Sequence, residues 1–122
     1  MAKKVLLIED SATDAAIINE VVKNNGFEIM VAQTAKEGFE KALELKPDLI
    51  LLDLMLPDES GFSLCSRIRK DKRLGEKLLI VVVSIKNDAK DIERAFAAGA
   101  DDYVIKPPSA EFLLKKIKLY LH

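Results

Sequence analysis

Two kinds of apolar segment alternate along this chain. Short unbroken runs of Val, Ile and Leu are typical of strands buried on both faces of a parallel sheet. The clear strands are residues 5–8, 49–52 and 78–83, and the weaker ones are residues 28–31 and 102–105. Between them, apolar residues recur at helical spacing. The markers of these helices are Ile17, Ile18, Val21 and Val22; Phe39, Ala42 and Leu43; Leu64, Cys65 and Ile68; Ile92, Ala95 and Phe96; and Phe112, Leu113, Ile117, Tyr120 and Leu121.

Residues that favour helix ends agree with this division. Thr34 followed by Glu37 forms a capping-box pattern, in which the Thr hydroxyl accepts the Glu37 amide and the Glu side chain reaches back to the Thr34 amide. The other expected helix ends are N-caps at Asn87 and Ser109, left-handed residues at Gly26 and Gly99, and a stop at Pro47. Each crossover is long enough for a right-handed strand–helix–strand unit. The chain is therefore predicted to be an α/β protein, a doubly wound five-stranded parallel sheet with five helices on both faces.

Polar residues follow the apolar strands where a site is expected. In open parallel sheets, ligands bind outside the carboxyl ends of the strands. The first strand is followed by Glu9 and Asp10, the third by Asp53, the fourth by Ser84 and the fifth by Lys106. Three carboxylates, a hydroxyl and an ammonium are thus predicted to meet at one end of the sheet.

This set of side chains indicates phosphoryl chemistry on a carboxylate. Neighbouring carboxylates repel by roughly 4 kcal/mol per pair at ~4 Å and an effective dielectric of ~20, so such a cluster holds a cation or raises a pKa. Oxygen ligands without His or Cys favour Mg2+, or Mn2+, over zinc or copper. Lys106 and Ser84 would complete a clamp on a phosphoryl group. A nucleotide or flavin site fits worse, because the first turn, residues 9–12, is acidic and lacks the glycines that cradle phosphate.

Length and charge narrow the class of protein. With 122 residues the chain has the size of one domain with one core. Its 19 Lys and Arg against 20 Asp and Glu give a net charge of −1, so the whole chain has no electrostatic reason to bind nucleic acid or an anionic membrane. The single cysteine, Cys65, is expected to be a small buried residue, and the single histidine is His122. The apolar run at residues 5–8 is too short for a signal peptide or membrane span, so we expect a soluble, cytoplasmic protein. The basic stretch at residues 67–73 is interpreted as a solvated helix end.

The ordered motifs resemble a known family. From Lys4 to Leu121 the chain resembles the receiver domain of two-component response regulators, the CheY-like fold. The motifs that carry the resemblance are residues 5–10, 48–53, 56–61, 83–84 and 98–107. The resemblance implies the strand order 2-1-3-4-5. It also implies that residues 1–122 form one receiver domain without an effector domain, either as a stand-alone receiver or as a domain cut at its boundary.

The resemblance further implies a nucleophile and a metal site. Asp53 corresponds to the phosphoacceptor, which attacks the phosphorus of a phosphohistidine as a carboxylate. Asp10 and Asp53 would bind Mg2+ directly, Glu9 would bind it directly or through water, and the main-chain carbonyl of Met55 would add an oxygen.

The resemblance also implies roles in phosphoryl binding and switching. Lys106 and the Ser84 hydroxyl would bind phosphoryl oxygens. Tyr103 occupies the place of the aromatic switch residue, which turns inward when the hydroxyl moves toward the phosphoryl group. The Lys106–Pro107 peptide would be cis, as is usual in the family.

Two positions depart from the family pattern. Ile85 lies where many receivers have Ala, and its larger side chain would narrow access to Asp53 or hinder inward movement of Tyr103. Pro108 replaces the more usual Phe after Pro107, which removes an aromatic side chain from the start of the last helix.

The leading hypothesis is a phosphorylation-activated signalling switch. It is not expected to be an enzyme beyond self-phosphorylation from small donors and slow dephosphorylation. The implied partners are a histidine kinase or histidine phosphotransfer protein and a downstream protein that binds the fourth helix, fifth strand and fifth helix. The sequence leaves undecided whether the chain forms a homodimer. No contact with nucleic acid or a membrane is expected. One alternative is a receiver-fold interaction module without phosphorylation, for which Ile85 is the best reason. A small Mg-dependent phosphatase of the haloacid dehalogenase type fits worse, because its general-acid Asp would stand at Met55.

Overall fold

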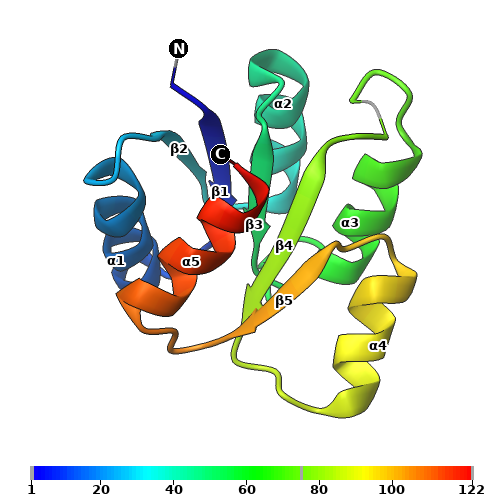
Figure 1. Cartoon of the computed structure of the whole chain (residues 1–122). Helices are drawn as coiled ribbons and strands as arrows, with labels where there is room; N and C mark the ends of the chain where they lie inside the picture. The colour runs from blue at the N-terminus through cyan, green and yellow to red at the C-terminus, as the bar shows by residue number, and fades with distance from the viewer. Residues whose placement is uncertain (1, 75, 122) are drawn as a thin grey trace.

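The predicted alternation of strands and helices is confirmed by a computed structural model (Figure 1), which describes residues 2–74 and 76–121. His122 lies outside the described residues. The strands are β1 (Lys4–Ile8), β2 (Glu28–Ala32), β3 (Leu49–Leu52), β4 (Leu79–Ser84) and β5 (Asp102–Ile105). The helices are α1 (Ala12–Lys23), α2 (Ala35–Leu45), α3 (Gly61–Lys70), α4 (Ala89–Ala97) and α5 (Ala110–Tyr120).

All neighbouring strands pair in parallel, in the order β2-β1-β3-β4-β5. This is the order that the family resemblance implied. The central pair sets Val5 of β1 opposite Leu49 of β3, and Ile8 opposite Leu52. Apart from Lys4 at the start of β1, both strands are buried, and their near-continuous apolar runs are explained by helices on both faces of the sheet.

The expectation of one core is corrected, because successive strand residues point into two core clusters, one on each face of the sheet. Leu6 and Ile8 of β1 pack with α2, α3 and α4, whereas Val5 and Leu7 pack with α1 and α5. Figure 1 shows the same layers, with α1 and α5 on one side of the sheet and α3 and α4 on the other. A one-residue slip of any central strand would exchange the two cores, so the register is firmly determined.

The helix ends are mostly as predicted, with two corrections. Ser109 caps α5, and Gly26 and Gly99 have positive φ values of 88° and 112°. The N-cap of α4 is Asp88 and not Asn87, because the Asp88 carboxylate accepts the Lys90 amide at 2.9 Å.

The second correction concerns the capping box of α2. Thr34 accepts the Glu37 amide at 3.0 Å, as predicted. The Glu37 carboxylate, however, accepts the amide of Gln33 at 3.0 Å and not that of Thr34. The helix ends at Leu45, and its C-cap, Lys46, has a left-handed φ of 48° directly before Pro47.

The reassigned cap of α4 makes a direct test possible. We expect Asp88→Ala to lower the free energy of unfolding by about 1 kcal/mol, because an N-cap carboxylate satisfies a helix amide and stabilises the positive end of the helix dipole. Asn87→Ala is the matched control and should change stability by less than about 0.5 kcal/mol. Urea unfolding of both variants measures the difference, and a larger loss for Asn87→Ala would return the cap to that residue.

Arg69 joins α3 to the amino ends of β4 and β5. Its guanidinium donates to the carbonyls of Gly99 at 2.7 Å and Leu78 at 2.5 Å and to the Asp101 carboxylate at 2.9 Å. Asp101 also accepts the amide of Ile80 at 2.9 Å. The basic stretch at residues 67–73 is therefore not merely solvated, since Arg69 is a tertiary anchor. Among the residues that the structure describes, no helix is both long and apolar enough to span a membrane.

Candidate functional site

The candidate site lies at the carboxyl ends of the central strands. The sheet hydrogen bonds continue one residue beyond each strand: the Glu9 amide donates to the Ala32 carbonyl at 2.8 Å, and the Asp53 amide donates to the Ile8 carbonyl at 3.0 Å. The Lys106 amide likewise donates to the Ser84 carbonyl at 2.8 Å. The backbones of Glu9, Asp53 and Lys106 are thus fixed by the sheet.

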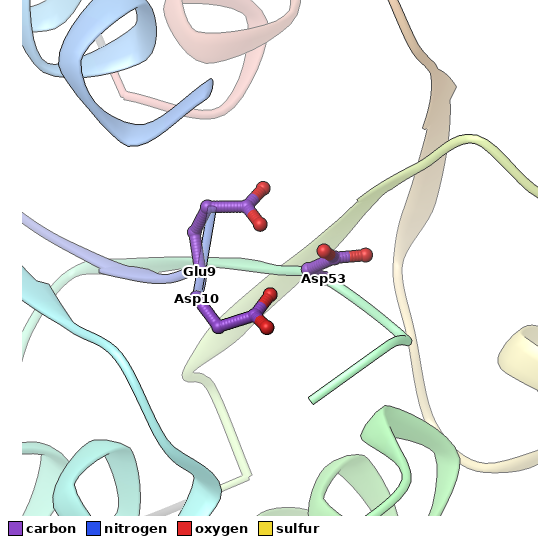
Figure 2. Close-up of side chains that lie close together, drawn as sticks. All are labelled: Glu9, Asp10 and Asp53. Carbon is purple, nitrogen blue, oxygen red and sulfur yellow. The ribbon is translucent and has the colours of Figure 1, made fainter. Parts of the chain in front are cut away.

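Three carboxylates meet at this edge, as predicted. Glu9 and Asp10 follow β1, Asp53 follows β3, and one oxygen of each lies within 4.8 Å of the others (Figure 2). Glu9 is 1% exposed and Asp53 is 6% exposed, whereas Asp10 is exposed to solvent. An all-oxygen cluster that is partly open to water fits Mg2+, which keeps several waters and takes one or two carboxylates. The donor set therefore suits the predicted metal.

Lys106 supplies the positive charge of the site. Its side chain is 7% exposed, and its ammonium pairs with Glu9, with Asp14 at 3.0 Å and with Asp53 at 3.4 Å. Burial acts to lower the pKa of Lys106, but the hydrogen bonds to Glu9 and Asp14 and the charge of Asp53 outweigh it and raise that pKa above its usual value. The ammonium is therefore charged at neutral pH.

The Glu9 carboxyl has a raised pKa because it is buried beside another carboxyl. Burial raises the pKa of the Glu9 carboxyl, and the neighbouring Asp53 carboxyl raises it further, while Lys106 acts in the opposite direction; the resulting pKa is about 7. Its second oxygen accepts the Ser11 amide at 3.2 Å. Without a divalent cation, the site thus has more negative charge than one lysine neutralises, and a cation is favoured there.

The loop after β3 folds tightly around Asp53. The Met55 amide donates to the Asp53 carboxylate at 3.3 Å, and Met55 forms an antiparallel bridge with Ser60. The Gly61 amide donates to the Leu54 carbonyl at 2.8 Å and closes the loop at the start of α3. Met55 is 49% exposed, so this residue contributes little to the core.

Asp58 anchors the same loop to α2. Its two carboxylate oxygens accept the amides of Ala35 at 2.9 Å and Lys36 at 3.0 Å. These backbone hydrogen bonds lower the pKa of Asp58. The first amides of a helix have no partner within the helix, and a carboxylate is a favourable acceptor for them. No local pattern in the sequence indicates which loop supplies this carboxylate.

A chain of hydrogen bonds leads from Ser84 to Tyr103. The Lys86 amide donates to the Ser84 hydroxyl oxygen at 3.3 Å, and the Tyr103 hydroxyl donates to the Lys86 carbonyl at 2.7 Å. Ser84 is fully buried, and Tyr103 is half-buried against the core that contains α3 and α4. Ile85 is 60% exposed and leaves this link intact. The Lys106–Pro107 peptide is cis, as the resemblance implied.

Asp14 is a member of the site that the sequence did not single out. It lies in the first turn of α1, and an acidic residue there is expected in any helix because of the helix dipole. Its contact with Lys106 joins residues far apart in the chain and depends on the packing of α1 beside the loop after β5. Only the tertiary structure indicates it.

Comparison with known proteins decides the family. A family model described as the response regulator receiver domain matches residues 5–118. This chain belongs to that family. Response regulator receiver domains are regulatory parts of two-component signalling systems, which agrees with the predicted class and with a site built around carboxylates at the ends of β1 and β3.

Two curated relatives of this receiver domain are longer proteins. Response regulator ArlR of Staphylococcus saprophyticus is 36% identical over 118 residues, which cover 97% of this chain and 52% of that protein. The DNA-binding response regulator MtrA of Mycobacterium tuberculosis is 32% identical over 121 residues, which cover 99% of this chain and 51% of that protein. The receiver domain thus spans about half the length of the curated relatives that it matches.

Solved structures of receiver domains have the same fold. A two-component response regulator from Clostridium difficile is 31% identical with a TM-score of 0.91, covering 98% of this chain and 95% of that one. The CheY-like receiver domain from Methanospirillum hungatei is 28% identical with a TM-score of 0.90, covering 98% and 93%. The BeF3-activated DrrB receiver domain is 26% identical with a TM-score of 0.90, covering 99% and 98%.

Proposed function

We propose that this receiver domain is a switch that accepts a phosphoryl group on Asp53. The observation that carries the proposal is the position of the Asp53 carboxylate, which is 6% exposed, belongs to the carboxylate cluster and lies 3.4 Å from the Lys106 ammonium. One carboxylate oxygen attacks the phosphorus of a phosphohistidine, the phosphorus–nitrogen bond breaks, and the imidazole leaves with a proton. The product is an aspartyl phosphate.

The cluster would hold Mg2+ through Asp10, Asp53 and Glu9, with the Met55 carbonyl as a further oxygen. When bound, the metal neutralises the charge that develops on the transferring phosphoryl oxygens. The support for this assignment is the all-oxygen donor set within 4.8 Å and the raised pKa of Glu9, about 7, which a divalent cation would relieve.

Lys106 and Ser84 are assigned to the new phosphoryl oxygens. Lys106 already reaches Asp53, and it exchanges the carboxylate oxygen for a phosphoryl oxygen. Ser84 accepts the Lys86 amide, and rotation of its hydroxyl toward the phosphoryl group would disturb the link through Lys86 to Tyr103. Phosphorylation must favour the active state by about 5 kcal/mol to move the domain from mostly off to mostly on.

The proposed partners follow from this chemistry. A histidine kinase or a phosphotransfer protein would supply the phosphoryl group, and a downstream protein would bind the face of α4, β5 and α5, on which Tyr103 lies. MtrA is named a DNA-binding protein, but this chain spans about half of it. For the receiver domain itself, with a net charge of −1, we propose no direct contact with nucleic acid.

Beryllofluoride provides the test, since it mimics a phosphoryl group on a carboxylate. We expect the amide resonances of Ser84, Lys106 and Tyr103 to shift to a new state, completely at saturation, when beryllium, fluoride and Mg2+ are all present. Omission of any one component should leave the spectrum of the free or Mg2+-bound protein. The Glu59→Gln variant, which alters a half-buried carboxylate of the same loop that lies outside the carboxylate cluster, should respond like the parent.

An unchanged spectrum with all three components, from a protein that binds Mg2+, would contradict the phosphoacceptor assignment and favour an interaction module without phosphorylation. Light scattering on the same sample determines whether a homodimer accompanies activation.

A further inference from the structure

The ammonium of Lys106 is fully engaged by carboxylates. It has three N–H donors, and three carboxylates lie within reach: Glu9, Asp14 at 3.0 Å and Asp53 at 3.4 Å. The side chain is 7% exposed, so water does not readily replace a lost partner. A buried ammonium that loses its partners is strongly destabilised. If two of these carboxylates bind another cation, the Lys106 ammonium therefore depends on the third carboxylate as its partner.

Two of the three partners also belong to the candidate metal cluster. Glu9 and Asp53 lie with Asp10 in the set whose oxygens are within 4.8 Å of one another. Lys106 and a divalent cation would therefore draw on the same two carboxylates. Binding of the cation would weaken at least part of the contact between Lys106 and these carboxylates.

Asp14 is the one partner of Lys106 that does not belong to the candidate metal cluster. It lies outside the carboxylate cluster, in the first turn of α1, where its amide donates to the Ser11 hydroxyl at 3.2 Å. Its side chain is 40% exposed, so water can solvate the carboxylate as well as Lys106 does. The helix start fixes its backbone, and the charge favours the positive end of the helix dipole.

We propose that Asp14 is a positioning residue that retains Lys106 when Glu9 and Asp53 bind Mg2+, and that it thereby strengthens metal binding. This inference rests on the proposed function, because it concerns the metal of the same site. Asp14 keeps the ammonium paired and close to Asp53 while the other two carboxylates turn to the cation. Lys106 then competes less with the metal for Glu9 and Asp53. It also stays close to Asp53, the proposed site of phosphorylation.

The first measurement is the Mg2+ affinity of the whole chain by isothermal titration calorimetry. Asp14→Asn keeps the shape of the side chain but removes the charge, and we expect Mg2+ to bind about fivefold more weakly, the effect of one partly exposed ion pair. Glu20→Gln is the matched control, since it removes the same charge from an exposed position of α1 that has no contact with Lys106. Its affinity should stay within about twofold of the parent.

The second measurement separates action through Lys106 from a simple field effect of the Asp14 charge. We expect Lys106→Met to bind Mg2+ more tightly than the parent, because the competing ammonium is gone. In that background Asp14→Asn should change the affinity by less than about twofold. If Lys106→Met does not fold, as judged by circular dichroism, Lys106→Gln replaces it in the same cycle.

The outcomes are distinct. A fivefold loss that disappears without Lys106 supports the positioning role. An equal loss in both backgrounds, or no difference between Asp14→Asn and Glu20→Gln, overturns it and leaves the proposed function intact. Failure of the parent to bind Mg2+ would instead refute the proposed metal site, and this inference with it.

Discussion

Asp53→Asn is expected to reduce phosphoryl incorporation from acetyl phosphate at least about a hundredfold, to the background of the assay. The amide oxygen is a poor nucleophile, and the substitution also removes one carboxylate from the three that surround the candidate metal site. Asn has nearly the same size as Asp, so the tight loop that follows β3 should be kept. Incorporation is measured with radiolabelled donor in the presence of Mg2+, followed by alkaline hydrolysis, which cleaves an acyl phosphate.

The matched control is Glu59→Gln, which makes the same carboxylate-to-amide change in the same loop. Glu59 accepts hydrogen bonds from Ser63 and Arg67 at the surface and lies outside the carboxylate cluster. It should incorporate phosphoryl label at the rate of the parent. Undiminished incorporation by Asp53→Asn would place the nucleophile on another residue and would invalidate the site assignment.

Gly61→Ala is expected to lower the free energy of unfolding by about 2–3 kcal/mol. A Cβ at this position would lie 2.5 Å from the Asp53 carbonyl oxygen and 2.5 Å from the Leu54 Cα. Both atoms are backbone, so the conflict is relieved only by moving the start of α3 or the end of β3. Since Asp53 belongs to the displaced segment, we also expect a weaker Mg2+ interaction.

Gly38→Ala is the control for this substitution. Its Cβ would meet the side chain of Ile8, the nearest atom at 2.6 Å, and that side chain can adjust more readily than a backbone. Gly38 is also inside α2, where Ala is favoured over Gly by about 1 kcal/mol. Urea unfolding of both variants should give a clearly smaller loss for Gly38→Ala. A loss below about 1 kcal/mol for Gly61→Ala would show that the backbone next to Asp53 does not require glycine at position 61.

The sequence allowed the sheet and the edge of the site to be predicted for a physical reason. Strands buried on both faces have unbroken apolar runs, and the polar residue that ends each run must lie at the carboxyl edge of a parallel sheet. Glu9, Asp10 and Asp53 could therefore be placed together before the structure was known. The strand order could not be predicted from the spacing of the elements alone. It was implied by the family resemblance.

Contacts between distant elements could not be predicted in the same way. Asp14, Asp58 and Arg69 are ordinary surface residues by local pattern, and each makes its decisive contact across more than 20 residues of sequence. The cap of α4 was assigned to Asn87 because Asn and Asp are nearly equivalent N-caps and stand side by side. Only the backbone geometry decides between them.

The pairing of Lys106 with Glu9 has a consequence for the time at which the site comes into existence. The two residues are 97 positions apart in the chain. Closing so long a loop is entropically costly, and parallel pairing offers no local shortcut, so this contact is expected among the late steps of folding. A chain still emerging from the ribosome has Asp53 long before it has Lys106. We therefore expect the proposed phosphoacceptor site to be complete only after synthesis has passed β5.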